Sequence, residues 1–106
     1  LLLGLAYKKN VDDLRESPSL EILKKLIKLG AKVKYSDPYV DTIPHIRKYN
    51  FSLSSSVINR KNLNDADLLL LATDHDDFDY DLILKNANLI IDTRGRLKNS
   101  EKVIKA

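Results

Sequence analysis

The chain has 106 residues, of which 43% are hydrophobic and 31% are charged, a composition typical of one folded domain. It contains no cysteine, which excludes disulfides and a cysteine nucleophile within these residues, and no apolar run reaches the roughly 18–20 residues that a membrane-spanning helix needs. The net charge of +3 is divided into blocks. Residues 1–61 carry 12 Lys and Arg against 6 Asp and Glu, residues 62–92 carry 1 basic residue against 8 acidic ones, and residues 93–106 carry 5 basic residues against 1 acidic one. This alternation of charge argues against a nucleic-acid partner.

The first part of the chain predicts a strand, a helix and a second strand. The apolar run over residues 1–6 is typical of a strand buried on both faces, and the polar residues 7–16 predict a loop. Ser17 and Pro18 favour a helix start, and apolar residues recur with helical spacing as far as Gly30, which favours its end. Residues 31–35 predict the second strand.

The rest of the chain predicts two shorter helices and two further strands. Residues 38–56 are irregular, residues 57–64 favour a short helix, and the leucine run over residues 68–72 predicts a third buried strand. An acidic loop over residues 73–79 is followed by an expected helix over residues 80–85 and a fourth strand over residues 89–91. We expect the tail from Leu97 to be mobile or weakly helical.

Apolar strands that alternate with helices predict an α/β domain with a three-layer, Rossmann-like open parallel sheet and helices on both faces. Right-handed crossovers bring the carboxyl ends of such strands to one edge of the sheet, where ligands bind. The segments expected at this edge are residues 7–9, 36–37, 73–75 and 93–94. The chain begins without methionine, and we expect residues 1–106 to be a single domain cut from a larger protein.

The loop after the first strand has two interpretations. This loop lies where a dinucleotide-binding fold carries three glycines. Here only Gly4 is present, and Gly4 lies inside the predicted strand. Lys8, Lys9 and Arg15 could hold phosphate by side-chain charge, and Arg15 could do so bidentately. The alternative is that both lysines are solvated surface and Arg15 pairs with a neighbouring carboxylate.

Other polar residues at the same edge also have alternatives. Asp37 has the position of a ribose-binding acid, but without the glycine loop an Asp that forms a turn before proline is favoured. Arg94 could enter a ligand site or form a surface ion pair with Asp92. The acidic residues 74–79 lack the Gly and Glu that a calcium loop requires, so we expect no metal site. No arrangement typical of nucleophilic catalysis is visible, and we expect no catalytic residue in this chain.

Three stretches resemble a known family. Residues 4–18, with the sequence Gly-Leu-Ala-Tyr-Lys-Lys-Asn-Val-Asp-Asp-Leu-Arg-Glu-Ser-Pro, resemble the opening of the C-terminal UDP-binding domain of the UDP-glucose/GDP-mannose dehydrogenase family. Residues 35–40 and the Ile-Pro pair at 43–44 are similar to the branch that oxidises UDP-N-acetylglucosamine. Residues 72–78 and 90–94 resemble the close of the same domain, so the resemblance extends from residue 1 to about residue 96.

The resemblance implies an NAD-dependent UDP-sugar 6-dehydrogenase. In that family the C6 alcohol of the sugar is oxidised twice, through a thiohemiacetal on a cysteine that lies upstream of this domain. An N-terminal domain binds NAD and a central helical region forms the dimer. The resemblance therefore implies a cytoplasmic homo-oligomer whose activity requires the missing domains, so that this fragment alone is inactive.

The resemblance also implies roles for single residues. Tyr7 corresponds to an aromatic beside the uracil, Lys8 to a lysine that contacts the substrate and Arg94 to an arginine that helps to hold the UDP-sugar. Arg15 corresponds to an arginine that reaches the NAD phosphates across the domain interface. Two alternatives remain open: a domain for UDP-N-acetylmannosamine or UDP-glucose, and a non-catalytic α/β nucleotide-binding module.

Overall fold

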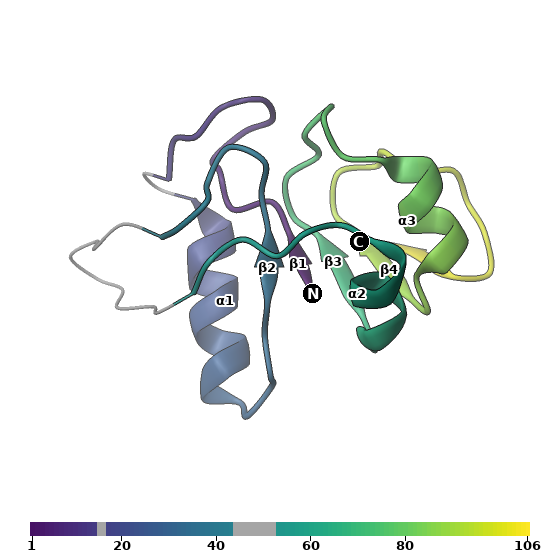
Figure 1. Ribbon diagram of the computed structural model, residues 1–106, viewed down its shortest axis with the longest axis horizontal. Coiled ribbons are helices and arrows are strands. Elements are labelled where there is room, and N and C mark those ends of the chain that lie inside the picture. The colour runs from purple at the N-terminus through teal and green to yellow at the C-terminus, as the bar shows by residue number, and fades with distance from the viewer. Residues whose placement is uncertain (15–16, 44–52) are drawn as a thin grey trace.

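The structure, a computed structural model, describes residues 1–14, 17–43 and 53–106. Its sheet has five parallel strands in the order β2-β1-β3-β4-β5. The strands are β1 (Leu2–Leu3), β2 (Tyr35–Ser36), β3 (Leu69–Leu71), β4 (Ile90–Asp92) and β5 (Val103–Lys105). The helices of the described residues are α1 (Pro18–Lys28), α2 (Arg60–Asp65) and α3 (Tyr80–Asn86). The predicted α/β fold with an open parallel sheet is confirmed (Figure 1).

Helix α1 begins and ends where the sequence predicts. The Ser17 hydroxyl accepts a hydrogen bond from the Ser19 N–H (3.3 Å), and Pro18 occupies the first helical position. Gly30 lies just beyond the last turn with a φ of +94°, the left-handed conformation that ends a helix. Leu20 and Leu23 are buried, so the apolar stripe of the sequence faces the sheet.

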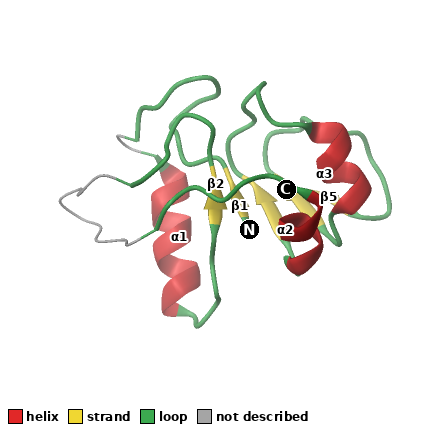
Figure 2. Ribbon diagram, in the orientation of Figure 1, coloured by secondary structure: helices red, strands yellow, loops and turns green. Residues whose placement is uncertain are grey.

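Helices lie on both faces of the sheet because consecutive strand residues point to opposite sides. Leu2 packs in one core with the buried residues of α1, whereas Leu3 packs in a second core with Leu63 of α2 and Ile83 of α3. Figure 2 shows the strands in the middle of the domain, with α1 on one side and α2 and α3 on the other. No helix within the described residues is both long and apolar enough to cross a membrane.

The expectation for the tail is wrong, because residues 103–105 form strand β5. The Ile90 N–H donates to the Lys102 carbonyl (2.7 Å), and the Ala106 N–H donates to the Asp92 carbonyl (3.0 Å). Two β-branched residues between lysines suit the edge of a sheet, where strand β4 would otherwise leave its backbone groups unpaired. The polar residues before this segment hide the strand pattern from a periodicity argument.

Three predicted strands are shorter than expected, although β3 lacks only one residue at each end of the predicted range 68–72. Strand β1 stops at Leu3 because Gly4 adopts a φ of +89°, which takes the backbone out of the extended conformation. Strand β2 begins at Tyr35 rather than at residue 31. The parallel strands nevertheless end at one edge of the sheet, and the loops after β1, β2 and β3 gather at the top of Figure 1.

Gly4 generates a prediction about stability. A Cβ atom there would lie 2.4 Å from the Thr73 Cβ and 2.6 Å from the Thr73 carbonyl oxygen. We expect Gly4→Ala to lower the free energy of unfolding by about 2–5 kcal/mol, through backbone strain and steric overlap, as measured by urea unfolding.

The matched control is Gly30→Ala, because Gly30 has a similar φ of +94° but no atom within 4 Å of its added Cβ. This control should lose only about 1–2 kcal/mol, the cost of the left-handed backbone alone. Equal losses in the two variants would show that the close approach to Thr73 is unimportant.

Candidate functional site

The residues expected to bind substrate lie on two loops at the carboxyl edge of the sheet. Tyr7 and Lys8 follow β1 and are exposed, and the Tyr7 side chain is 50% accessible. Arg94 follows β4 and is also exposed. Because β3 lies between β1 and β4, the two loops are separated by two strand spacings, or about 10 Å. A ligand that contacts both loops must therefore cross the loop after β3.

Asp92 organises the turn that carries Arg94. It is 1% exposed, and its Oδ1 accepts hydrogen bonds from the N–H groups of Arg94 and Gly95, both at 2.9 Å. Its Oδ2 accepts from the Leu97 N–H (2.8 Å) and from the Lys105 ammonium (3.2 Å). Burial alone would raise the pKa of Asp92, but these donors outweigh it and hold the pKa below the ordinary value.

The Arg94 guanidinium is directed toward β3. Its Nε donates to the Ala72 carbonyl at 2.7 Å, which orients the side chain across the end of the neighbouring strand. The surface ion pair with Asp92 considered above does not form, because that carboxylate is buried and bonded to the Arg94 backbone. Within the described residues, the Arg94 guanidinium forms no ion pair with a carboxylate.

Asp37, which follows β2, is a second buried carboxylate with several hydrogen-bond donors at this edge. It is 1% exposed, and its Oδ2 accepts from the N–H groups of Leu5 (2.7 Å) and Ala6 (3.3 Å). Its Oδ1 accepts from the Tyr39 N–H (2.8 Å), which is the predicted turn. A ribose-binding role for Asp37 is excluded, since the carboxylate is buried and its oxygens already accept from the protein.

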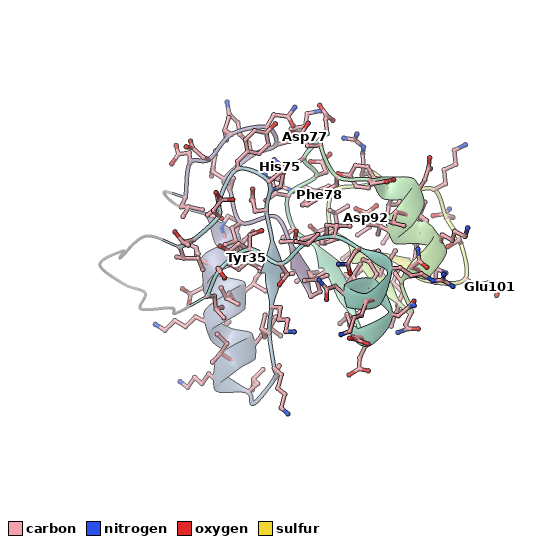
Figure 3. The ribbon with its side chains drawn as sticks, in the orientation of Figure 1. Tyr35, His75, Asp77, Phe78, Asp92 and Glu101 are labelled. Carbon is pink, nitrogen blue, oxygen red and sulfur yellow. The ribbon has the colours of Figure 1, made fainter. Side chains whose placement is uncertain are left out.

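His75 links the loop after β3 to the loops after β1 and β2. It is fully buried, its Nε2 lies 2.9 Å from the Asp37 Oδ2, and its Nδ1 accepts from the Asn10 N–H at 2.8 Å. A backbone N–H can only donate, so Nδ1 is the acceptor and the imidazole proton lies on Nε2, where it is donated to Asp37. The centres of the Tyr39 and Phe78 rings lie 4.8 Å and 5.6 Å from the centre of the imidazole. Figure 3 shows His75 and Phe78 near each other at this edge.

The pKa of Asp37 is also set by burial and hydrogen bonds acting in opposite directions. Burial raises the pKa of its carboxyl, but the hydrogen bonds from His75, Leu5 and Tyr39 lower the pKa by more, so that it falls below the ordinary 3.8. Sequence reasoning missed this arrangement because its partners other than Tyr39 lie 31 to 65 residues apart. The one indication in the sequence was a histidine inside an acidic segment.

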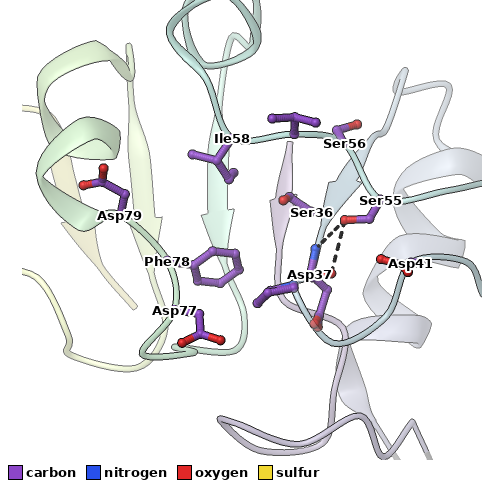
Figure 4. Close-up of a pocket in the computed structure, with 11 residues that line it drawn as sticks. Ser36, Asp37, Asp41, Ser55, Ser56, Ile58, Asp77, Phe78 and Asp79 are labelled. Atoms are coloured by element: carbon purple, nitrogen blue, oxygen red, sulfur yellow. Dashed lines mark hydrogen bonds between the residues drawn. The ribbon is translucent and has the colours of Figure 1, made fainter.

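A cavity of about 380 Å³ lies beside this pair, between the loop after β2 and the loop after β3. Figure 4 shows Phe78 and Ile58 on one side of it and Ser55 and Asp41 on the other. Asp77 and Asp79 also line it, so three carboxylates besides that of Asp37 surround the space. Such a lining repels phosphate, whereas the exposed cations at this edge lie on the loops after β1 and β4.

Two further expectations from the sequence concern Arg15 and the acidic loop over residues 73–79. Arg15, expected to contact NAD, lies outside the described residues. The acidic loop serves the fold: Asp79 caps α3 by accepting from the Leu82 N–H (3.1 Å), and Asp74 and Asp76 pair with Arg96. In the part of the chain that the structure describes, no three His, Asp or Glu side chains are grouped so that they could hold a metal ion.

The buried Asp37 carboxylate makes stability depend on pH. We expect Asp37→Asn to lose about 2–3 kcal/mol of unfolding free energy near neutral pH, because an amide cannot accept every hydrogen bond that the carboxylate accepts. The pKa of Asp37 is lowered by folding, so its stabilisation is present above the unfolded pKa near 3.8 and is lost as the pH falls through the folded value.

Urea unfolding at successively lower pH should therefore show the unsubstituted chain and the Asp37→Asn variant converging in stability. Asp65→Asn is the matched control, because Asp65 forms only an exposed ion pair with Lys61 (3.0 Å), which contributes little. A stability difference that stays constant down to strong acid would contradict this role for Asp37.

Comparison with known proteins finds several nucleotide-sugar dehydrogenases that are similar to this chain. The UDP-N-acetyl-D-mannosamine dehydrogenase of Methanococcus maripaludis is 34% identical over 108 residues, which cover 93% of this chain and 23% of the relative. The UDP-glucose 6-dehydrogenase of Rickettsia bellii is also 34% identical, over 94% of this chain and 24% of the relative. The solved UDP-N-acetyl-mannosamine dehydrogenase of Staphylococcus aureus superposes with a TM-score of 0.70 at 29% identity, over 98% of this chain and 24% of that one.

The chain thus spans about a quarter of the length of these relatives. Residues 1–99, nearly the whole chain, match the sequence model of the UDP-binding domain of the UDP-glucose/GDP-mannose dehydrogenase family. The chain belongs to the UDP-glucose/GDP-mannose dehydrogenase family, as its UDP-binding domain.

Proposed function

We propose that this domain binds the UDP-sugar substrate of an NAD-dependent nucleotide-sugar 6-dehydrogenase, with Tyr7, Lys8 and Arg94 as its substrate-binding residues. The observation that carries the proposal is the placement of Lys8 and Arg94 on exposed loops at the carboxyl edge of a parallel sheet, where such folds bind ligands. The membership of the UDP-binding family supports the nucleotide.

The chemistry of each side chain fits part of a UDP-sugar. The half-exposed Tyr7 ring offers an apolar face on which uracil can stack. Lys8 offers a mobile point charge and Arg94 a planar set of donors, both suited to phosphate oxygens. The carboxylates around the neighbouring cavity repel the diphosphate and favour its placement toward the cations.

For the sugar, we propose a UDP-N-acetylhexosamine. Residues 35–40 favour UDP-N-acetylglucosamine, whereas two of the relatives above are named for N-acetylmannosamine and one for glucose. N-acetylglucosamine and N-acetylmannosamine differ only in configuration at C2. Assaying the full-length enzyme against a panel of UDP-sugars decides among them.

NAD, in this proposal, is held mainly outside this chain. The Leu5 and Ala6 N–H groups, which follow β1 where a dinucleotide fold presents its glycine loop, are bonded to Asp37. These residues therefore do not fit a dinucleotide, and Arg15 remains the proposed contact from this chain to the NAD phosphates. The cofactor would accept hydride from the sugar C6, with the catalytic cysteine also outside this cysteine-free chain. We also propose that the full-length enzyme is a cytoplasmic homo-oligomer.

The first test is binding of UDP to the chain, measured by calorimetry. We expect Lys8→Ala and Arg94→Ala each to weaken binding by about 2–3 kcal/mol, the contribution of hydrogen bonds to a charged group. Lys32→Ala is a matched control, because it removes the same charge as Lys8→Ala from an exposed position before the amino end of β2. Unchanged affinity in both site variants would remove the proposed site.

The second test concerns catalysis. The 106-residue chain should not reduce NAD with any UDP-sugar, because the proposal places the cysteine nucleophile and most of the NAD site elsewhere. The measurement is NADH absorbance, with a full-length relative as positive control. Turnover by this chain alone would overturn the proposed division of labour, whereas a full-length protein that binds UDP without oxidising any UDP-sugar would favour a non-catalytic binding module.

A further inference from the structure

The loop that carries Tyr7 and Lys8 is closed at its base and held at its tip. At its base the Tyr7 N–H donates to the Asp13 carbonyl at 2.7 Å. At its tip Asn10 adopts a φ of +64° and turns its amide toward the loop after β3. There Asn10 Oδ1 accepts from the Asp76 N–H (2.9 Å), and Asn10 Nδ2 donates to the Asp76 Oδ2 (2.7 Å). This two-bond pair connects segments 66 residues apart.

The other oxygen of Asp76 reaches the loop after β4. Asp76 Oδ1 accepts from Arg96 Nη1 at 2.8 Å, and the Arg96 guanidinium lies 4.7 Å from the centre of the Tyr80 ring. Arg96 is two residues beyond Arg94. One carboxylate therefore bonds, through its two oxygens, to the loop that carries Lys8 and to the loop that carries Arg94.

This chain of contacts differs from the Asp37–His75 pair in its exposure. The side chains of Asp76 and Arg96 are 51% and 30% accessible, whereas those of Asp37 and His75 are fully buried. Exposed ion pairs contribute little to stability, because water solvates both partners once they separate. The contacts of Asp76 can therefore fix where two loops lie without being needed for folding.

We propose that Asn10, Asp76 and Arg96 form a positioning relay that sets the distance between Lys8 and Arg94 for the diphosphate of the ligand. The inference deepens the proposed function and rests on it. The three residues act through the loops and need not touch the ligand themselves. The hydrogen bonds from Asn10 and Arg96 lower the pKa of Asp76, which favours the charged carboxylate that both partners contact.

The sharpest test exchanges the two partners. Asn10→Asp places two carboxylates opposite each other, and Asp76→Asn removes the charge that Arg96 contacts. The double variant restores a carboxylate–amide pair, since a carboxylate at position 10 can accept from both the backbone N–H and the side-chain amide at position 76. Asn10→Gly removes the side-chain bonds without changing charge, and glycine tolerates the positive φ of this residue.

The measurements are the Kd of UDP and the urea unfolding midpoint, both at high ionic strength to screen long-range charge effects. We expect each single variant to bind UDP about tenfold more weakly, as contacting groups in one network can couple by this amount. The double variant should return to within about threefold of the original Kd. Unfolding midpoints should barely change, and Asp65→Asn, which breaks the exposed pair with Lys61, should change neither quantity.

Every other outcome contradicts either the relay alone or the relay together with the proposed function. If UDP binds and Lys8→Ala weakens it but Asn10→Gly does not, the relay is overturned while the proposed function stands. A double variant as weak as the two losses combined would also overturn the relay, and so would Kd changes that follow lost stability. If the unsubstituted chain does not bind UDP, the proposed function fails and the relay fails with it.

Discussion

The buried carboxylate of Asp37 is the constraint on which the carboxyl edge of this domain depends. Removing a charge from water costs several kcal/mol unless donors replace the lost hydration. Here the donors come from three directions: the backbone after β1, the turn after β2, and His75 after β3. Displacing one of these segments would leave a buried charge short of partners. The ends of three strands are therefore held together by the need to satisfy one side chain, while the two apolar cores hold the layers.

This arrangement bears on how the proposed ligand would be held. In a dinucleotide fold, the N–H groups after the first strand point at the pyrophosphate and require glycine for close approach. In this chain the N–H groups of Leu5 and Ala6 are occupied by Asp37, so under the proposed function the phosphates would be held by side chains that reach beyond the backbone. The acidic cavity lies on the β2 side, whereas the exposed cations follow β1 and β4. Negative and positive side chains are therefore separated along this edge of the sheet.

The sequence predicted the features that depend on local chemistry and missed those that depend on distant partners. Capping by Ser17 and Pro18, the stop at Gly30 and the buried leucine strand β3 follow from neighbours a few residues away. Strand β5 escaped prediction because an edge strand of two β-branched residues has almost no pattern of its own. The roles of Asp92 and His75 escaped because burial, which turns a polar residue into an organiser of loops, is a property of the fold. The expected position at the carboxyl edge of the sheet made Lys8 and Arg94 candidates, with a surface role as the alternative for each. The family resemblance added Tyr7 and assigned each residue a part of the ligand.

Gly4, directly after β1, connects the local sequence with the contacts between distant loops. At Gly4 the chain passes so close to Thr73 that a Cβ would overlap both the backbone and the side chain of that residue. The same approach lets the Thr73 hydroxyl donate to the Ala6 carbonyl at 2.7 Å, beyond the last paired residue of β1. The loops after β1 and β3 therefore leave the sheet side by side, which is the condition for Asn10 to reach both His75 and Asp76. A glycine placed directly after β1 thus has a different use from that in a dinucleotide site, because it lets the loops after β1 and β3 meet through their side chains. Under the proposed relay, these contacts would also set the position of Lys8.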